Sequence, residues 1–168
     1  EIAASGDRIY ALDADNNIVT WYRVSTGRAT PIVLVDSSGG PIADIKSIVA
    51  GSPLFALKNN GEWLTLQGTG RIFTGSRYEV VPALLVDSQN TPISDIQSIA
   101  TGSYSHSLAL KANGSVLAWG GNGSGQLGDG STIDQVSPVA VIDQNDVPIN
   151  LYNSGTTTSL DSVALAAG

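Results

Sequence analysis

Cysteine and methionine are absent from this 168-residue chain, and positive charge is scarce. Without cysteine the chain has no disulfide, thiolate nucleophile or zinc–thiolate site. Lys and Arg number 8 against 15 Asp and Glu, the net charge is −7, and no base follows Lys111. Because phosphate backbones are bound by clustered Lys and Arg, this distribution predicts no nucleic-acid partner and disfavours anionic membrane surfaces.

Long apolar runs are missing as well. No segment approaches the roughly 20 apolar residues that span a bilayer, and the chain does not open on a signal-peptide pattern, so we expect no membrane insertion. The chain does contain 19 glycines, and only 14% of its residues are charged. Together with frequent Ser, Thr, Asn and Asp, this composition favours many short strands joined by tight turns.

The chain repeats itself. Four segments look like copies of one strand end: Ile2-Ala3-Ala4-Ser5-Gly6, Ile48-Val49-Ala50-Gly51, Ile99-Ala100-Thr101-Gly102 and Leu165-Ala166-Ala167-Gly168. They delimit three repeats, at residues 7–51, 52–102 and 103–168.

Landmarks inside the repeats support this alignment. An apolar run in each repeat leads to a polar pair, namely Asp15-Asn16, Asn60-Gly61 and Asn113-Gly114. We expect a two-residue type I′ hairpin there, with positive φ at both positions. The return strands then place Leu66 in register with Trp21 and Trp119.

Proline and aspartate positions also coincide. Six of the seven prolines fall into two registers, Pro31, Pro82 and Pro138 in one and Pro41, Pro92 and Pro148 in the other. Asp36, Asp87 and Asp143 lie midway between them, and Asp44, Asp95 and Asp161 precede each closing glycine by seven residues. Since proline donates no backbone hydrogen bond, these prolines mark strand starts and edges.

Four short strands per repeat of about 50 residues are typical of a β-propeller blade. We therefore predict an all-β fold: one partial β-propeller segment over residues 1–168, built from three tandem four-stranded blades. Because propellers typically use about 4 to 8 blades, three do not close a ring on their own.

The third repeat carries a sharper motif. It reads His106-Ser107-Leu108-Ala109-Leu110-Lys111, then Ala118-Trp119-Gly120, then Gly125-Gln126-Leu127-Gly128-Asp129-Gly130. This combination resembles the regulator of chromosome condensation repeat. The first two repeats are degenerate copies that lack the Gly-rich loop and have Arg8 and Pro53 at the position of His106. The resemblance implies seven-bladed rings, so we expect a portion of a longer propeller or a unit completed by self-association.

Three motifs suggest chemistry and are better explained by structure. His106 is the single histidine, and its place in the motif indicates a structural role. Asp13–Asn17 resembles the start of a calcium loop, but Ile18 and Val24 stand where an EF-hand needs Gly and Glu. The glycine-rich stretch 120–130 has no phosphate-binding Lys. We predict no catalytic residue, no metal site and no cofactor.

Two departures from the repeat are candidate protein contacts. In the second repeat, Arg71, Phe73, Arg77 and Tyr78 replace the Gly-rich loop with residue types enriched at interfaces; interblade packing explains them equally well. In the third, an insert at 150–159 begins with Leu151, Tyr152 and Asn153. Loops on a rigid scaffold often carry function, although a neutral insertion accounts for it as well.

We predict a non-enzymatic protein-binding or scaffolding module, part of a larger β-propeller. Scarce Lys, absent Cys and the Val141–Pro148 pattern resemble repeats of bacterial extracellular proteins, which implies a secreted or cell-surface location. One alternative is a structural segment that self-assembles through exposed blade edges into a ring or filament. Another is guanine-nucleotide exchange like that of the family's namesake, which the acidic last repeat disfavours.

Overall fold

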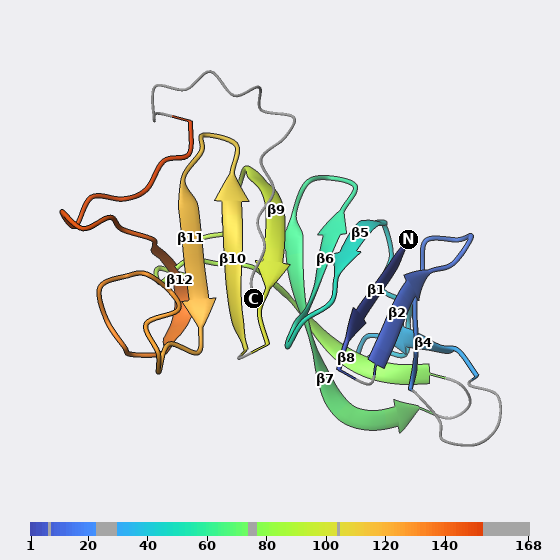
Figure 1. Ribbon diagram of the computed structural model, residues 1–168. Coiled ribbons are helices and arrows are strands. Elements are labelled where there is room, and N and C mark those ends of the chain that lie inside the picture. Colours follow the sequence, from blue (N-terminus) through green and yellow to red (C-terminus); the bar gives the residue numbers. More distant parts are fainter. Residues whose placement is uncertain (7, 23–29, 74–76, 104, 153–168) are drawn as a thin grey trace. The chain divides into compact units, whose positions relative to one another are not determined.

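The computed structural model describes residues 1–6, 8–22, 30–73, 77–103 and 105–152, and every regular element among them is a β-strand (Figure 1). The strands are β1 (Ile2–Ser5), β2 (Arg8–Leu12), β3 (Ile18–Tyr22), β4 (Ile32–Val35), β5 (Ile45–Val49), β6 (Leu54–Lys58), β7 (Trp63–Phe73), β8 (Arg77–Leu84), β9 (Ile96–Thr101), β10 (His106–Lys111), β11 (Val116–Gly120) and β12 (Gln135–Ala140). The chain divides into two compact units, Glu1–Leu85 and Val86–Gly168, which are described separately below.

The strands group into three four-stranded antiparallel blades. We call β1–β4 the first blade, β5–β8 the second and β9–β12 the third, since each strand pairs antiparallel with the next in its group. Within the first unit, β4 also pairs parallel with β8, which joins two blades into one eight-stranded sheet. Neither sheet closes on itself among the described strands. The predicted all-β, unclosed propeller architecture is thus confirmed.

The blades are offset by one strand from the sequence repeats. The segment that ends the first repeat forms β5, yet β5 pairs with β6 across Gly51. Likewise β9 ends the second repeat and pairs with β10 across Gly102. Each blade therefore takes its first strand from the end of the preceding repeat, while the repeat boundaries themselves remain a sequence prediction.

The polar pairs do lie in hairpins, but the predicted type I′ geometry is wrong. Only the second residue of each pair has positive φ: 59° at Asn16, 90° at Gly61 and 86° at Gly114. In the second blade, the Gly61 amide donates to the Lys58 carbonyl at 3.0 Å and the Lys58 amide to the Glu62 carbonyl at 2.8 Å. This is a three-residue loop, whose single left-handed residue needs Gly or Asn.

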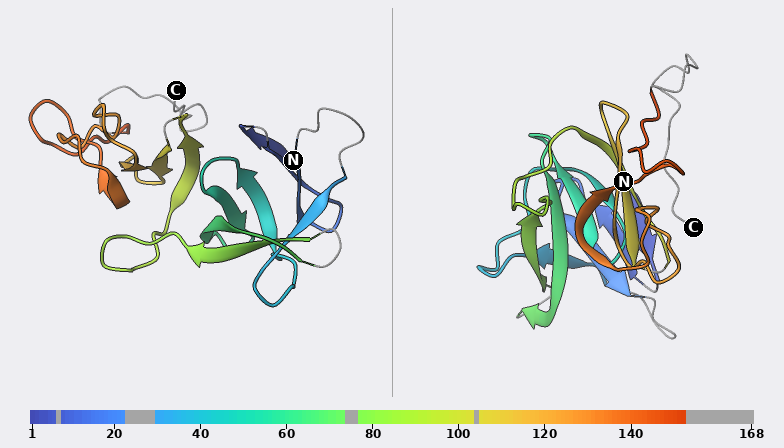
Figure 2. Two further views of the ribbon diagram at one scale, coloured as in Figure 1. Left: turned by 90° about the horizontal axis from the view of Figure 1, so that it is seen from below. Right: turned by 90° about the vertical axis from the view of Figure 1, so that its left-hand side faces the viewer.

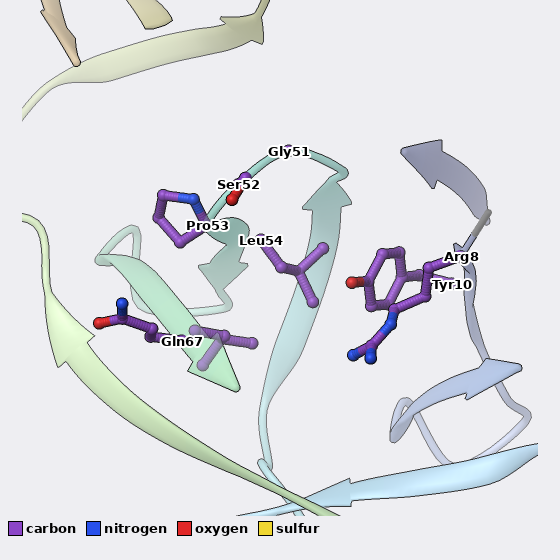
Figure 3. Close-up of a pocket in the computed structure, with 8 residues that line it drawn as sticks. Arg8, Tyr10, Gly51, Ser52, Pro53, Leu54 and Gln67 are labelled. Carbon is purple, nitrogen blue, oxygen red and sulfur yellow. The ribbon is translucent and has the colours of Figure 1, made fainter. Parts of the chain in front are cut away.

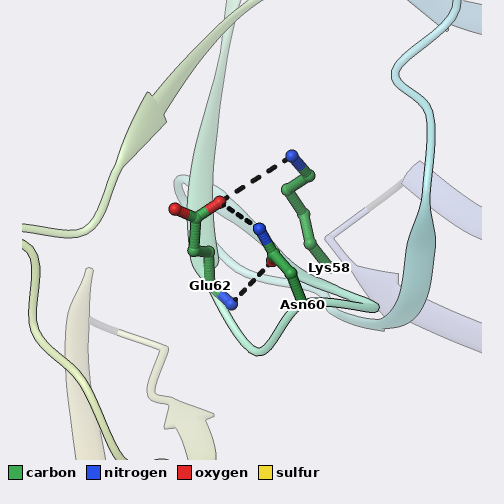
Figure 4. Close-up of polar contacts among 3 residues, drawn as sticks. All are labelled: Lys58, Asn60 and Glu62. Atoms are coloured by element: carbon green, nitrogen blue, oxygen red, sulfur yellow. Dashed lines mark hydrogen bonds and ion pairs between the residues drawn. The ribbon is translucent and has the colours of Figure 1, made fainter.

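Side chains reinforce the hairpin of the second blade (Figure 4). The Asn60 amide donates to Glu62 Oε2 at 2.7 Å, and the Glu62 backbone amide donates to Asn60 Oδ1 at 3.1 Å. Lys58 lies 3.8 Å from the same carboxylate oxygen. Because this ion pair is partly exposed, it contributes at most about 1 kcal/mol to stability.

The aspartates midway between the prolines are turn residues. Asp36 Oδ1 accepts hydrogen bonds from the Ser38 and Gly40 amides, at 2.8 and 3.1 Å. Asp87 Oδ1 and Asp143 Oδ1 likewise each accept hydrogen bonds from the backbone amides two and four residues later in the chain. Each turn brings the second proline back beside the preceding strand, in the bridges Val35–Pro41, Val86–Pro92 and Ile142–Pro148. The shared Asp–Pro spacing therefore encodes one local turn.

The core of the first unit lies between its two blades. Its buried members are Tyr10, Ile18, Leu34, Ile42, Ile45, Ile48, Leu54, Ala56, Leu64, Leu66 and Val80. Residues two apart on a strand point to the same face, so Leu54 and Ala56 face this core together. Burial of these apolar side chains is the main force that joins the first and second blades.

Candidate functional site

A pocket of about 390 Å³ opens in the first unit, between strand ends of its two blades. Its lining residues are Arg8 and Tyr10 from β2, Gly51, Ser52 and Pro53 from the β5–β6 loop, Leu54 from β6, and Leu66 and Gln67 from β7. Tyr10 and Arg8 lie on one side, Leu54 faces the Tyr10 ring, and Gln67 lies on the other side (Figure 3). The pocket thus joins segments more than forty residues apart in sequence.

Strand geometry explains which side chains line this pocket. Arg8 and Tyr10 are two residues apart on β2 and therefore share the face that looks toward the second blade. Leu54 and Leu66 are direct partners across β6 and β7 and share a face for the same reason. Tyr10, Leu54 and Leu66 are buried, whereas Ser52 and Gln67 are exposed at the rim.

The pocket occurs where these two blades depart from the repeat. Leu66 stands at the position that Trp21 and Trp119 hold in the other repeats, so a large ring is replaced by a smaller side chain. Arg8 and Pro53 stand where the third blade has His106. Both departures are visible in the sequence and are the available signal for this pocket, although neither was predicted to form a site.

In the third blade the corresponding position is filled. The His106 side chain is 7% exposed and lies so close to the backbone of Gly102 that a Cβ there would overlap its ring. Its Nδ1 has no hydrogen-bond partner in the described part of the chain. The ring is thus packed into the turn, and the structural role of His106 stays a prediction.

The Gly-rich loop of the third blade is organised around Asn122, which is fully buried. Its Nδ2 lies within 3.2 Å of four oxygens, on Asp129, Ser131 and Ile133, and its Oδ1 accepts from the Leu127 amide at 3.0 Å. The loop amides of Gly125 and Gly128 donate to carbonyls within the loop. These amides are therefore engaged by the loop itself, in keeping with the structural interpretation of residues 120–130.

The same loop lowers the pKa of the Asp129 carboxyl group. Burial alone would raise its pKa, but hydrogen bonds from the Ser131 amide and hydroxyl, Asn122 and Gln135 together lower it. The Gln135 amide donates to Asp129 Oδ2 at 2.9 Å. Asp129 is thus held ionised as an acceptor inside the loop.

Comparison with known proteins identifies this blade. A profile of the regulator of chromosome condensation (RCC1) repeat matches residues 96–126, and a second profile of the same repeat matches residues 113–160. Residues 96–160 of the chain belong to the RCC1 repeat family. The resemblance predicted from the motif at 106–130 is confirmed.

Relatives share the RCC1 blades over part of their length. The ultraviolet-B receptor UVR8 of Arabidopsis thaliana is 39% identical over 62 residues, which are 37% of this chain and 13% of UVR8. The mitochondrial RCC1 domain-containing protein RUG3 of the same plant is 44% identical over 64 residues, 38% of this chain and 14% of RUG3. The chain therefore spans about a seventh of each curated relative.

The fold is shared more widely. The crystal structure of Prp20p from Saccharomyces cerevisiae, a protein described as binding Gsp1p and histones, superposes with a TM-score of 0.61 at 20% identity. The match covers 86% of this chain and 38% of Prp20p. This similarity places the degenerate first and second blades in the RCC1 propeller fold along with the third.

The arginine-aromatic segment of the second blade forms part of a hairpin. Arg71 and Phe73 belong to β7, Arg77 and Tyr78 belong to β8, and Phe73 pairs with Arg77. β7 and β8 continue well past the ends of β5 and β6 (Figure 2), in place of the Gly-rich loop. The structure describes only the backbone of 68–73 and 77–79, so a contact role for the four side chains stays a prediction.

The start of the third-repeat insert packs on its own RCC1 blade. The Leu151 amide donates to the Gly114 carbonyl at 2.9 Å, and the Tyr152 hydroxyl donates to Gln97 Oε1 at 2.6 Å. A Cβ at Gly114 would lie 2.6 Å from Tyr152 Cδ2, so the ring covers the hairpin. Both Leu151 and Tyr152 are half-buried. Asn153 lies outside the described residues.

No three His, Asp or Glu residues in the described part of the chain gather closely enough to hold a metal ion. Within the same residues there is no helix of the length and apolarity needed to cross a membrane.

Proposed function

We propose that this chain is a protein-binding part of a larger RCC1-type β-propeller and that it acts without catalysis. The proposal draws on the RCC1 repeats at 96–160 and on structural neighbours that are described with protein partners. Prp20p is described with Gsp1p and histones, and yeast RCC1 is described bound to Kap60. A rigid sheet scaffold with variable strand ends suits such a role.

The pocket between the first and second blades is the observation that carries the proposal. It combines buried apolar side chains, Tyr10, Leu54 and Leu66, with the polar rim residues Arg8 and Gln67. Apolar concave sites with a few placed polar groups are the usual form of binding sites. The pocket also lies where the first two blades have lost the repeat's own residues, so these positions are open to a binding role.

A secreted or cell-surface location belongs to the same proposal and rests on the sequence resemblance alone. Fractionation of the source cells, followed by immunodetection of the parent protein, tests it. Recovery from the medium or the cell surface is expected, whereas confinement to the cell interior would contradict this part.

Site-specific photocrosslinking tests the binding function. A benzophenone amino acid replaces exposed Gln67 at the pocket rim or, as a control, exposed Gln89 in the turn that follows β8. We expect a protein adduct from source-cell extract that is specific to residue 67. The purified partner should then bind the unmodified chain in a 1:1 complex by calorimetry. If no purified candidate binds, the proposed function fails.

A further inference from the structure

The geometry points to a specific occupant of this pocket: an acidic segment of a partner protein, which places a carboxylate at Arg8 and an adjacent apolar side chain against Tyr10, Leu54 and Leu66. This inference rests on the proposed function and names the chemistry of its partner. It follows from three features of the pocket: the charge of its lining, its apolar interior, and the Leu at position 66 in place of the Trp of the other two repeats.

The charge of the lining selects an anion. Among the eight lining residues that the structure describes, Arg8 is the single charged side chain, and none of the eight is acidic. This stands out in a chain of net charge −7. A guanidinium has five N–H donors in a planar fork that matches a carboxylate, so it can serve a ligand as well as the chain itself. Gln67 and Ser52 add exposed polar groups at the rim.

The apolar interior of the pocket favours a ligand that carries an apolar side chain next to its anionic group. Tyr10 is 7% exposed, Leu54 3% and Leu66 2%, and Pro53 adds a further apolar surface beside them. A phosphate or nucleotide is bound by several cations or by a nest of backbone amides, whereas this lining has one cation over an apolar interior. A carboxylate next to an apolar side chain is complementary to both parts, and a peptide segment supplies the two at once.

Residue 66 creates the space. The other two repeats have tryptophan at this position, Trp21 and Trp119, and the Trp119 side chain is itself buried in the third blade. Leu66→Trp therefore restores a residue that the same strand position accepts elsewhere in the chain. The indole should project into the neighbouring pocket and exclude the ligand without removing Arg8.

A random dodecapeptide library displayed on phage provides the probe. Selection on the immobilised wild-type chain should enrich peptides in which Asp or Glu lies next to Leu, Ile, Phe or Trp. One enriched peptide, synthesised with a fluorescent label, is then titrated by fluorescence polarisation against wild type, Arg8→Gln, Arg8→Lys, Leu66→Trp and Lys46→Gln. Lys46 is exposed on β5 and outside the pocket lining, so Lys46→Gln matches the charge loss of Arg8→Gln.

We expect Arg8→Gln and Leu66→Trp each to weaken binding by about tenfold or more, with Arg8→Lys intermediate and Lys46→Gln within about twofold of wild type. Added salt should also weaken binding, because a rim ion pair is screened. Thermal unfolding of each variant is measured alongside, and only variants that unfold within a few degrees of wild type are compared.

Three results would overturn the inference. The first is a selected peptide that binds wild type and Leu66→Trp equally. The second is enrichment of sequences without acidic residues. The third is Arg8-dependent binding of inorganic phosphate or ATP together with no binding of any acidic peptide. Each of these leaves the proposed function standing if the crosslinked protein partner binds, whereas failure of every protein partner defeats the proposed function itself.

Discussion

The imidazole ring of His106 lies against the backbone of Gly102, in the space that a Cβ at residue 102 would fill. The Gly102 amide also donates to the His106 carbonyl at 2.8 Å. The two residues close the turn between β9 and β10, so the glycine that ends the second repeat and the histidine of the third repeat form one packing unit.

Gly102→Ala should therefore destabilise the unit Val86–Gly168 by about 1–3 kcal/mol, since the new methyl group must displace the ring. Urea denaturation measures the change. In a His106→Ala background the same substitution should cost less than about 1 kcal/mol, because the ring is gone. Equal costs in the two backgrounds would show that the ring is not the cause.

Asn122→Ala should unfold or loosen the Gly-rich loop, with a loss of about 2–4 kcal/mol, because the acceptors on Asp129, Ser131 and Ile133 lose the buried Asn122 amide as their donor. Urea denaturation and amide hydrogen exchange at 122–134 are the measurements. Ser124→Ala, on the exposed side of the same loop, should stay within about 0.5 kcal/mol of wild type. Comparable losses for the two variants would contradict the central role of Asn122.

The hairpin glycines offer a matched pair. Gly61 has no atom within 4 Å of the place a Cβ would take, whereas at Gly114 the Tyr152 ring and Asn150 occupy that place. Asn16 already adopts the same left-handed conformation, so Gly61→Asn should cost below about 1 kcal/mol. Gly114→Asn should cost about 1–3 kcal/mol more, because it displaces Tyr152. Thermal and urea unfolding test the difference, and equal costs would contradict the packing of Tyr152 on the hairpin.

The turn aspartates predict a loss of stability in acid. The Ser38 hydroxyl and amide lower the pKa of Asp36, and the Val147 and Asn145 amides lower that of Asp143. A carboxyl group with a lowered folded pKa stabilises the fold above the unfolded value of about 3.9 and loses that contribution as pH falls through the folded value.

The double variant Asp36→Asn/Asp143→Asn keeps the acceptor oxygens and removes these two titrations. Below about pH 4, its free energy of unfolding should fall less steeply with decreasing pH than that of wild type. Urea denaturation at a series of pH values provides the comparison. Asp15→Asn is the control, because the Asp15 carboxylate takes part in none of these turns. An unchanged slope in the double variant would rule out the turns as the source.

Much of the local structure was predictable because its causes are close together in sequence. Asp36 bonds amides two and four residues away, and Asn16 and Gly61 hold left-handed positions that few other residues tolerate. The four strands of each blade followed from such turns at regular spacing. The type of hairpin did not, because the pairs Asp15-Asn16 and Asn60-Gly61 fit both the two-residue and the three-residue loop.

The amino-acid sequence by itself determined the repeat, the strands, the turns and the RCC1 family of the third blade, since each depends on neighbouring residues or on a contiguous motif. Only the tertiary structure decided that β5 pairs across Gly51, that Tyr152 covers Gly114, and that Arg8 meets Leu66 in a pocket. The last two contacts join residues far apart along the chain. They depend on how buried faces of separate strands pack, which spacing alone does not specify.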